Sequence, residues 1–311
     1  MFEGKHYVYE VYREMSFSKA AKNLFISQPS LSAAVKKEER AVGFPIFDRS
    51  VSPIQLTELG KEYIRACEII LDVENGFQNY VSDMHEMKSG TLSIGGTNFY
   101  ASYILPHLLS LFTKSYPKIR ISLVEEPSAE LKDKLLAGAL DLMIDNSDMD
   151  PSIFEKHFFC EEQLLLVVPA SFSANEAVRN YAFTPQQIRE KQHLSSRIPP
   201  VPLTAFSEEP FLLLQPGNDT RLRADRLLRA AGITPNIRLE PEQQITAYKL
   251  ARHGMGIAFC GDLLISHVSD SEQLLCYKLD PKEASREVNI YFKRNRYLSK
   301  AMQAFLTLAE D

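Results

Sequence analysis

The sequence of 311 residues lacks tryptophan and contains only four cysteines. Cys67, Cys160, Cys260 and Cys276 show no CxxC spacing, and no cluster of cysteines and histidines has the spacing of a metal site. The GxSxG, Walker, HExxH and GxGxxG motifs of common enzymes are also missing. These absences argue against catalysis, and we expect neither an enzyme nor a bound metal or cofactor.

The sequence also lacks a long apolar run. No segment approaches the roughly 20 apolar residues that a membrane-spanning helix needs. The opening stretch, MFEGKHYVYEVYREMSFS, has no cationic leader followed by an apolar core, so no signal peptide is evident. We therefore expect a cytoplasmic protein, with no membrane partner, whose thiols are buried and free. A redox-sensing pair of Cys260 and Cys276 is the alternative.

A strong positive charge is missing as well. The net charge is -5, and residues 1–60 carry eight basic and seven acidic side chains. This balance excludes a generally basic coat for nucleic acid. DNA binding would have to depend on where the cations lie and on helix N-termini that face phosphates. It would be modest for one chain and sensitive to salt, so we expect a dimer.

Residues 16–49 predict two short helices joined by a tight turn. Ser18 is a suitable N-cap for the first helix, and Ser27 for a second helix with Pro29 in its first turn. Leu31 and Val35 would point inward at helical spacing. The outward side would carry a short polar and partly cationic row, namely Gln28, Ser30, Ser32, Lys36 and Lys37. Such a row suits a helix in the major groove of DNA, although an ordinary helical hairpin has the same pattern.

A long helix is predicted from Thr57 to about Met87. Its apolar positions alternate steps of four and three residues over about four heptads: Leu59, Tyr63, Ala66, Ile70, Val73, Phe77, Tyr80, Met84 and Met87. The helix could pack on its own domain, but its length and unbroken heptads favour a partner chain. Gly76 lies mid-helix at a cost of about 1 kcal/mol relative to alanine.

Beyond residue 90 the pattern changes to alternating strands and helices. We predict strands at 91–97, 119–126, 140–145, 211–215, 237–240, 256–260 and 288–294, with helices between most of them, and a crossover into a second lobe at 164–169. This order predicts a parallel sheet that is covered on both faces. Residues 170–209 contain several prolines and read as a surface excursion with one short helix.

Several elements near the N-terminus resemble LysR-type transcriptional regulators in order and spacing: Ala20-Ala21, Ser27-Gln28-Pro29, Leu31-Ser32, Gly43, Phe47, Arg49, Leu56-Thr57 and Gly60. The resemblance implies an all-α winged helix-turn-helix with a small wing at residues 1–58. It further implies a dimerising linker helix at 59–89 and a two-lobed α/β effector domain, similar to periplasmic binding proteins, at 90–311. Lobe one would comprise 90–164 and 271–311, and lobe two 165–270.

The DNA-binding residues that the pattern and the resemblance indicate are Ser18, Ser27, Gln28, Pro29, Ser30, Ser32, Lys36, Lys37 and Arg49. This sequence also departs from the family. Ala33 stands where an arginine is common, and Glu38 occupies an inward position that usually holds leucine. Glu38 must therefore reach solvent or find a cationic partner. Ser52 and Pro53 replace a second basic residue in the wing.

Ligands of open α/β sheets bind beyond the carboxyl ends of the strands. The candidate effector-binding residues at these ends are Thr97, Asn98, Phe99, Tyr100, Ser128, Asn146, Gln215 and Thr220, together with the loop after Glu240. Each of these could instead be a simple helix cap. Hydroxyl, amide and backbone N–H groups gathered there suit a carboxylate or another small anion, so we expect a small-molecule effector of that class.

We therefore expect a cytoplasmic, ligand-responsive transcriptional regulator that binds double-stranded DNA as a homodimer or tetramer. RNA polymerase is a further candidate partner. The alternative is a small-molecule binding protein or receptor with a non-functional DNA-binding head.

Overall fold

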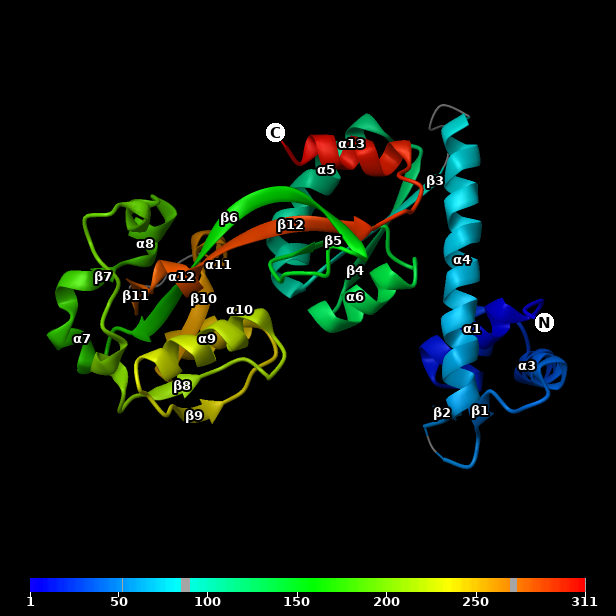
Figure 1. Cartoon of the computed structure of the whole chain (residues 1–311), viewed down its shortest axis with the longest axis horizontal. Coiled ribbons are helices and arrows are strands. Elements are labelled where there is room, and N and C mark those ends of the chain that lie inside the picture. Colours follow the sequence, from blue (N-terminus) through cyan, green and yellow to red (C-terminus); the bar gives the residue numbers. More distant parts are fainter. Residues whose placement is uncertain (52, 85–89, 269–272, 311) are drawn as a thin grey trace. The chain divides into compact units, whose positions relative to one another are not determined.

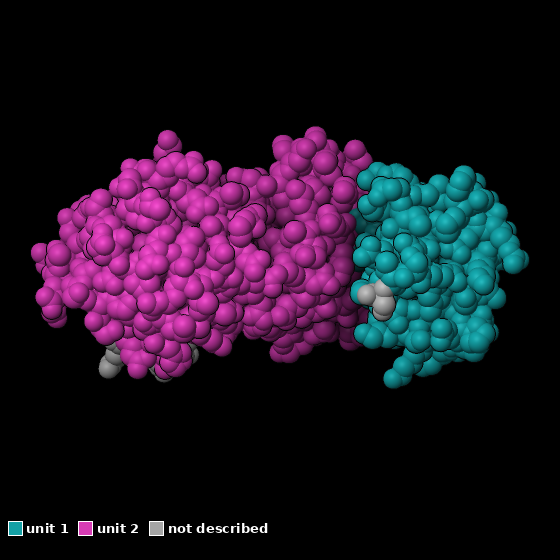
Figure 2. Space-filling model, turned by 90° about the horizontal axis from the view of Figure 1, so that it is seen from below, with its two compact units in different colours: residues 1–81, 137–139 teal, residues 82–136, 140–311 magenta. Residues whose placement is uncertain are grey.

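The computed structural model describes residues 1–51, 53–84, 90–268 and 273–310 (Figure 1). The chain divides into two compact units (Figure 2). The head unit comprises residues 1–81 with 137–139, and the lobed unit comprises residues 82–136 and 140–311. Among the described residues, no helix combines the length and apolar character that a membrane crossing requires.

The head unit consists of helices and one short hairpin. Its elements are α1 (Lys5–Glu14), α2 (Phe17–Asn23), α3 (Gln28–Val42), β1 (Phe47–Asp48), β2 (Gln55–Leu56) and most of α4 (Glu58–Met84). Ser27 caps α3 as predicted, and Gly43 ends it with a left-handed φ of 88°. The predicted cap of α2 is wrong. Ser16 has the extended backbone that a cap needs and accepts from the Lys19 N–H, so Ser18 lies inside the helix.

The head core confirms the inward positions of α3. Leu31 and Val35 are fully buried, and the small side chains of Ala20 and Ala21 lie in the same cluster. Glu38 is also buried, and among the described residues it makes no ion pair, in contrast to the prediction, although the positive charge of the N-terminus lowers its pKa. Its carboxylate accepts hydrogen bonds from the backbone N–H groups of Phe2 (2.9 Å) and Gly4 (2.7 Å). Neutral donors, rather than a basic side chain, therefore satisfy this buried charge.

The long helix α4 ends at Met84 within the described residues; Met87, like Ser52 of the wing, lies outside them. Tyr63 was predicted on the intermolecular seam, but it is buried in the head core next to Ile64 and Cys67. The apolar side chains that α4 exposes are Leu59, Ile69, Val73, Phe77, Tyr80 and Val81. In the first turns of α4 the exposed positions therefore differ from the predicted heptad: Tyr63 is buried, and Ile69 is exposed.

The lobed unit contains the α/β part of the chain. Its strands are β3 (Gly90–Gly96), β4 (Ile119–Glu125), β5 (Leu142–Asp145), β6 (Phe154–Pro169), β7 (Ala182–Phe183), β8 (Pro210–Leu212), β9 (Asn236–Leu239), β10 (Ile257–Gly261), β11 (Leu274–Lys278) and β12 (Ser285–Lys293). Its helices are a π-helical turn (Tyr100–Ile104), α5 (Leu105–Ser115), α6 (Ser128–Leu136), α7 (Ala174–Ala177), α8 (Pro185–Arg189), α9 (Asp219–Ala230), α10 (Gln244–Arg252), α11 (Asp262–His267), α12 (Pro281–Ala284) and α13 (Lys300–Leu308), with three short 3-10 turns, at Arg179–Tyr181, Gln192–Leu194 and Leu203–Phe206.

The strands follow the order β4-β3-β5-β12-β6-β10-β8-β9; in addition, β11 pairs with β6, and β7 pairs with β11. The predicted all-parallel sheet is wrong. Strands β3, β4 and β5 are parallel, as are β8, β9 and β10, but β12 runs antiparallel to both β5 and β6. The chain returns to lobe one along β12, next to the strand by which it left. Because β6 leaves lobe one and β12 comes back to it, the two neighbouring strands run in opposite directions.

Two long strands join the lobes (Figure 1). Residues 154–163 of β6 pair with β12 in lobe one, and residues 164–169 pair with β10 and β11 in lobe two. Strand β11 therefore belongs to the sheet of lobe two, so the predicted boundary at residue 271 lies too early. The return to lobe one occurs at Ser285, where β12 begins.

The predicted surface excursion at residues 170–209 is a packed part of lobe two. Strand β7 pairs with β11, and Ile188 and Phe206 are fully buried. The segment also contains more than the one predicted helix, because α7, α8 and several 3-10 turns lie within it. His193 is buried and bonds to Asp262 at 2.8 Å, which fixes the segment to the start of α11.

Candidate nucleic-acid interface and ligand cleft

The outward face of α3 is polar, as predicted. Gln28, Ser30, Lys36 and Lys37 are exposed, and Ser32 is half-buried. Lys37 makes an ion pair with Glu3 at 3.3 Å, and both side chains are highly exposed. Within the described residues Lys36 makes no ion pair. Side chains of this face could reach base edges or phosphates in a groove.

The first turn of α3 is held by hydroxyl groups. Ser27 Oγ accepts from the backbone N–H of Ser30 at 3.2 Å, and the two hydroxyls lie 2.7 Å apart. Pro29 occupies the first turn of α3, where a backbone N–H has no acceptor within the helix, so the N–H that proline lacks costs no hydrogen bond. Ser18 donates to Oε1 of Gln28 at 3.2 Å, so a residue of α2 orients the first side chain of α3.

Arg49 follows β1 and is oriented by three neighbours. Its guanidinium pairs with Glu39 at 3.1 Å, donates weakly to Ser32 Oγ at 3.4 Å and lies 4.6 Å from the centre of the Phe17 ring. Glu39 also accepts from the Ile46 N–H, which joins the start of the wing to α3. The predicted DNA-binding residues thus lie on α2, α3 and the wing of one unit, and Arg49 lies beside the outward face.

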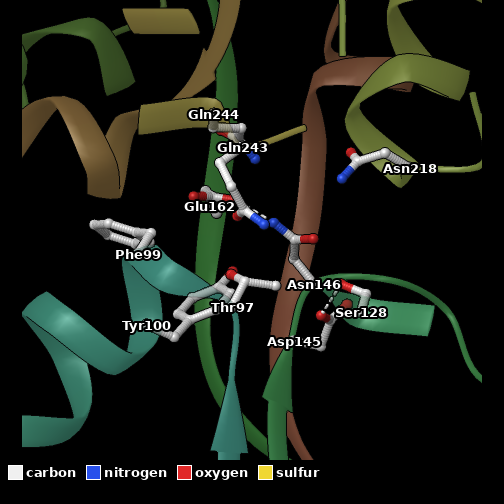
Figure 3. A pocket seen from close by; sticks show the side chains of 10 residues that line it. All are labelled: Thr97, Phe99, Tyr100, Ser128, Asp145, Asn146, Glu162, Asn218, Gln243 and Gln244. Carbon is white, nitrogen blue, oxygen red and sulfur yellow. Dashed lines mark hydrogen bonds between the residues drawn. The ribbon is translucent and has the colours of Figure 1, made fainter. Parts of the chain in front are cut away.

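A small cavity lies where the two lobes meet (Figure 3). Its volume is about 30 Å³. The residues that line it are Thr97, Phe99, Tyr100, Ser128, Asp145, Asn146, Glu162, Asn218, Gln243 and Gln244. We call it the inner cavity. It brings together five of the predicted effector-binding residues, from the ends of three strands of lobe one, with residues of lobe two.

A second cavity of about 420 Å³, the outer cavity, is lined by Asn98, Glu125, Glu126, Pro127, Glu242, Gln243, Ile245, Thr246 and Lys249. The two cavities share Gln243. Asn98, also predicted, faces the outer cavity and donates to Glu125 at 2.6 Å. The loop after Glu240 contributes to both cavities, as the sequence indicated.

Two predicted residues line neither cavity. Gln215 is exposed, and its backbone N–H bonds to Pro241. Thr220 is buried behind the wall, where its hydroxyl accepts from Gln244 (2.9 Å) and Arg286 (2.9 Å). Thr220 therefore supports the lining rather than forming it.

Sequence reasoning missed Asp145, Glu162, Asn218, Gln243 and Gln244 as individual residues of the lining, and Arg286 behind it. Glu162 and Arg286 lie opposite each other on β6 and β12, where the two strands cross between the lobes. Nothing in the sequence predicted a strand over residues 154–163. For Asn218, the signal available was its position as N-cap of α9.

Arg286 is buried and holds the crossing strands together. Its Nε donates to Glu162 at 2.7 Å, and one terminal nitrogen contacts both Asp219 (3.0 Å) and Thr220. Burial lowers the pKa of Arg286, but the negative charge of Glu162 outweighs it and the pKa lies above its ordinary value. Arg286 is therefore charged and already paired with carboxylates of both lobes.

Asp145 and Tyr100 complete the inner cavity. Asp145 accepts from the Ser128 hydroxyl at 2.6 Å (Figure 3). It also accepts from the Ser147 N–H at 2.7 Å. The Tyr100 hydroxyl is buried and has no hydrogen-bond partner among the described residues. Burial and the charge of Glu162 raise the pKa of Tyr100 well above its usual value, so the phenol is neutral.

The described cysteines are free thiols. Burial raises the pKa of Cys276 to about 12, and it raises the pKa of Cys260 further. Protonated, buried thiols react slowly, which does not favour the redox-pair alternative. In the part of the chain that the structure describes, no group of three or more metal-ligating side chains is assembled.

Two family models match the chain. Residues 5–61 match the model described as bacterial regulatory helix-turn-helix protein, lysR family, and residues 85–311 match the LysR substrate binding domain. The chain belongs to the LysR family. It is a DNA-binding transcriptional regulator with an effector-binding domain, and regulators of this family are not enzymes.

Similar proteins match this chain over most of their own length. The uncharacterized HTH-type transcriptional regulator YcgK of Bacillus subtilis is 28% identical over 98% of this chain and 92% of its own. The structure of full-length CbnR complexed with the target DNA has a TM-score of 0.62, with 18% identity, over 99% of this chain and 98% of that one. The regulatory domain of Synechocystis CcmR in complex with 2-PG has a TM-score of 0.58, with 19% identity, over 71% of this chain and 96% of that one.

Proposed function

We propose that this LysR-family chain binds operator DNA as a dimer through the outward face of α3, and that a small molecule in the cleft between the lobes controls the binding. The observation that carries the first part is the division of α3 into a fully buried apolar side and an exposed polar side. The fold likeness to CbnR, whose structure contains target DNA, supports it.

Within this proposal, Gln28 reads bases and Lys36, Lys37 and Arg49 contact phosphates. The amide of a glutamine side chain can bond to adenine through both its oxygen and its nitrogen, and Ser18 orients the Gln28 amide. The head is only slightly basic, so a single copy would bind weakly. Two heads on one operator would place their α3 helices about one helical turn of DNA apart, or a multiple of it.

The exposed side of α4 supports the dimer. Ile69, Val73 and Phe77 are 56%, 68% and 67% exposed, and Tyr80 follows at the next helical step. We call these residues the α4 stripe. Large apolar side chains in one row are costly in water, and a second α4 would cover them in the manner of a coiled coil. A tetramer would be formed by pairs of such dimers.

The cleft supports control by a small molecule. Both cavities are lined by side chains from the two lobes, and the chain crosses between the lobes on β6 and β12. A ligand that contacts both lobes favours one angle between them, which would bias the conformation that binds DNA. The CcmR regulatory domain, of similar fold, was solved with 2-PG.

Genomic fragments that the purified protein retains, followed by footprinting on them, would identify the operator. On that operator we expect Gln28→Ala to weaken specific binding by about 1–3 kcal/mol, because one base contact is lost. Gln186→Ala, a change of an exposed glutamine on α8, is the matched control and should leave the affinity unchanged. Equal affinities of the Gln28→Ala variant and the parent would contradict the assignment. Small-molecule binding without any protected DNA would favour a receptor with a non-functional head.

A further inference from the structure

The cleft is acidic. The residues that line the inner and outer cavities include five carboxylates (Glu125, Glu126, Asp145, Glu162 and Glu242) and one ammonium group, that of Lys249. Lys134 pairs with Glu126, outside the two linings. The lining therefore carries more negative than positive charge. A carboxylate ligand, which the sequence led us to expect, would be repelled by these groups.

Arg286 balances the charge of Glu162 but offers no free guanidinium to a ligand. It is almost completely buried, lines neither cavity and is already shared between Glu162 and Asp219. Its contact with Glu162 uses Oε2, which also accepts from Asn146 at 3.0 Å. Among the described residues, Oε1 of Glu162 accepts no hydrogen bond. One oxygen of a charged carboxylate on the cavity wall is thus left without a donor.

Asp145, unlike Glu162, has no cationic partner in the part of the chain that the structure describes. Its hydrogen bonds come from two serines, Ser128 and Ser147, which are neutral donors. Such donors hold a carboxylate in place but leave its negative charge uncompensated. Asp145 and Glu162 therefore present two carboxylates to the same small space, and Arg286 balances the charge of Glu162 but not that of Asp145.

The Tyr100 hydroxyl is a second, independent sign of a ligand. Tyr100 is 3% exposed and lines the inner cavity, yet its hydroxyl has no partner among the described residues. A buried hydroxyl without a partner is costly, and such groups are normally satisfied by a neighbour, by water or by a ligand. The negative charges of Glu162 and Asp145 and the positive charge of Arg286 act on this phenol. Its oxygen can accept a hydrogen bond from a cationic donor.

The sizes of the cavities limit the ligand further. The inner cavity of about 30 Å³ exceeds the roughly 10–15 Å³ that one water molecule needs, so it has room for a small polar group. A primary ammonium group has about this size. The outer cavity is large enough for the aliphatic part of a small molecule, and its own carboxylates suit a second positive charge.

We propose that the effector is an organic cation that places a primary ammonium group in the inner cavity, against Glu162 Oε1 and the Tyr100 hydroxyl. Aliphatic diamines are the simplest members of this class. The inference rests on the proposed function, because it assigns a ligand chemistry to the cleft that would control DNA binding.

Calorimetric titration of the full-length protein with three four-carbon probes tests the chemistry. The probes are 1,4-diaminobutane, the uncharged 1,4-butanediol and the anionic succinate. We expect the diamine to bind at least tenfold more tightly than the other two. Succinate binding that equals or exceeds diamine binding would overturn the inference, as would the absence of diamine binding at millimolar concentrations.

A pair of tyrosine variants tests the site. Tyr100→Phe removes a hydroxyl that bonds to none of the described residues, so the fold should be unchanged. We expect it to weaken diamine binding about tenfold, the effect of one hydrogen bond to a charged group. Tyr248→Phe is the matched control, because the Tyr248 hydroxyl is also buried without a partner but lies outside both cavities. Equal losses in both variants, or no loss in Tyr100→Phe, would contradict the site.

Operator binding measured on the same samples separates this inference from the proposed function. Retained operator binding without a diamine response would overturn the cationic effector and leave the regulator in place. Diamine binding that depends on Tyr100, in a protein that protects no DNA, would support the ligand and overturn the proposed function.

Discussion

The Tyr63 hydroxyl on α4 donates a hydrogen bond to the Glu38 carboxylate on α3 at 3.0 Å. The same carboxylate accepts from the backbone N–H groups of Phe2 and Gly4. One side chain thus joins α3, the long helix that exposes the α4 stripe and the segment before α1. The angle between α3 and α4 within the head is therefore fixed by a polar contact as well as by apolar packing.

We expect Glu38→Gln to destabilise the head by about 2 kcal/mol at neutral pH, because hydrogen bonds to a charged acceptor are lost or weakened. Burial raises the pKa of Glu38, but the Gly4 N–H, the Tyr63 hydroxyl and the Phe2 N–H lower it more, so the pKa lies below its usual 4.5. This contribution to stability is fully present above pH 4.5 and is lost as the pH falls through the folded pKa. The melting temperatures of parent and variant should therefore become equal at acidic pH. A constant difference at all pH values would contradict the role of the charge.

Replacement by alanine should have opposite effects on stability at Gly60 and at Gly76. A Cβ at Gly60 would lie 2.1 Å from the carbonyl oxygen of Ile46, so we expect Gly60→Ala to cost about 3 kcal/mol or more and to abolish DNA binding. Gly76 lies mid-helix, where an added Cβ would meet no neighbouring atom within 4 Å, and Gly76→Ala should stabilise α4 by roughly 0.5–1 kcal/mol. Circular dichroism melts measure both. A melt of the Gly60→Ala variant like that of the parent would show that the first turn of α4 can move away from β1.

The α4 stripe predicts the oligomeric state. A charge in its centre, as in Phe77→Glu, should dissociate the dimer, because an unpaired carboxylate would be buried between two helices. Ile70→Glu, next to the stripe and half-buried, should have a similar but smaller effect. Leu222→Glu is the control, since Leu222 is 51% exposed on α9 of lobe two. Sedimentation velocity distinguishes the states, and an unchanged coefficient for Phe77→Glu would count against this interface.

The pair of His193 and Asp262 predicts how the 170–209 segment is held. His193→Leu removes a buried partner of Asp262, whose other oxygen accepts from the Gln163 N–H. We expect a loss of about 1–3 kcal/mol in the free energy of unfolding of lobe two. His267→Leu, a change of an exposed histidine, should have little effect. Urea denaturation followed by circular dichroism compares the two, and equal midpoints would show that apolar packing alone holds the segment.

Sequence reasoning was most successful where the spacing of residues determines the structure directly. The buried side of α3 follows from Leu31 and Val35, and most strands beyond residue 90 follow from short apolar runs. The family motifs also have local physical causes. Thr57 accepts from the Gly60 N–H and donates to the Pro45 carbonyl, and Gly60 makes room for the Ile46 carbonyl.

Sequence reasoning failed where parts of the chain that are distant in sequence determine the environment of a residue. The stretch from Phe154 to Gln163 contains many polar residues because one end of β6 is half-exposed, so it did not read as a strand. Glu162 and Arg286 are separated by more than a hundred residues and gain their role only by pairing across β6 and β12. The partners of Glu38 could not be predicted either, since backbone N–H groups leave no signal in the sequence.

The register of β6 and β12 places Gln163 directly opposite Ser285, so the segment that forms lobe two leaves and re-enters the rest of the chain at neighbouring positions. Lobe two is therefore an insertion with adjacent ends, and an exchange of that single continuous piece between relatives would leave the framework of lobe one intact. Genetic recombination can thus vary half of the ligand site while the other half and the DNA-reading head are inherited unchanged.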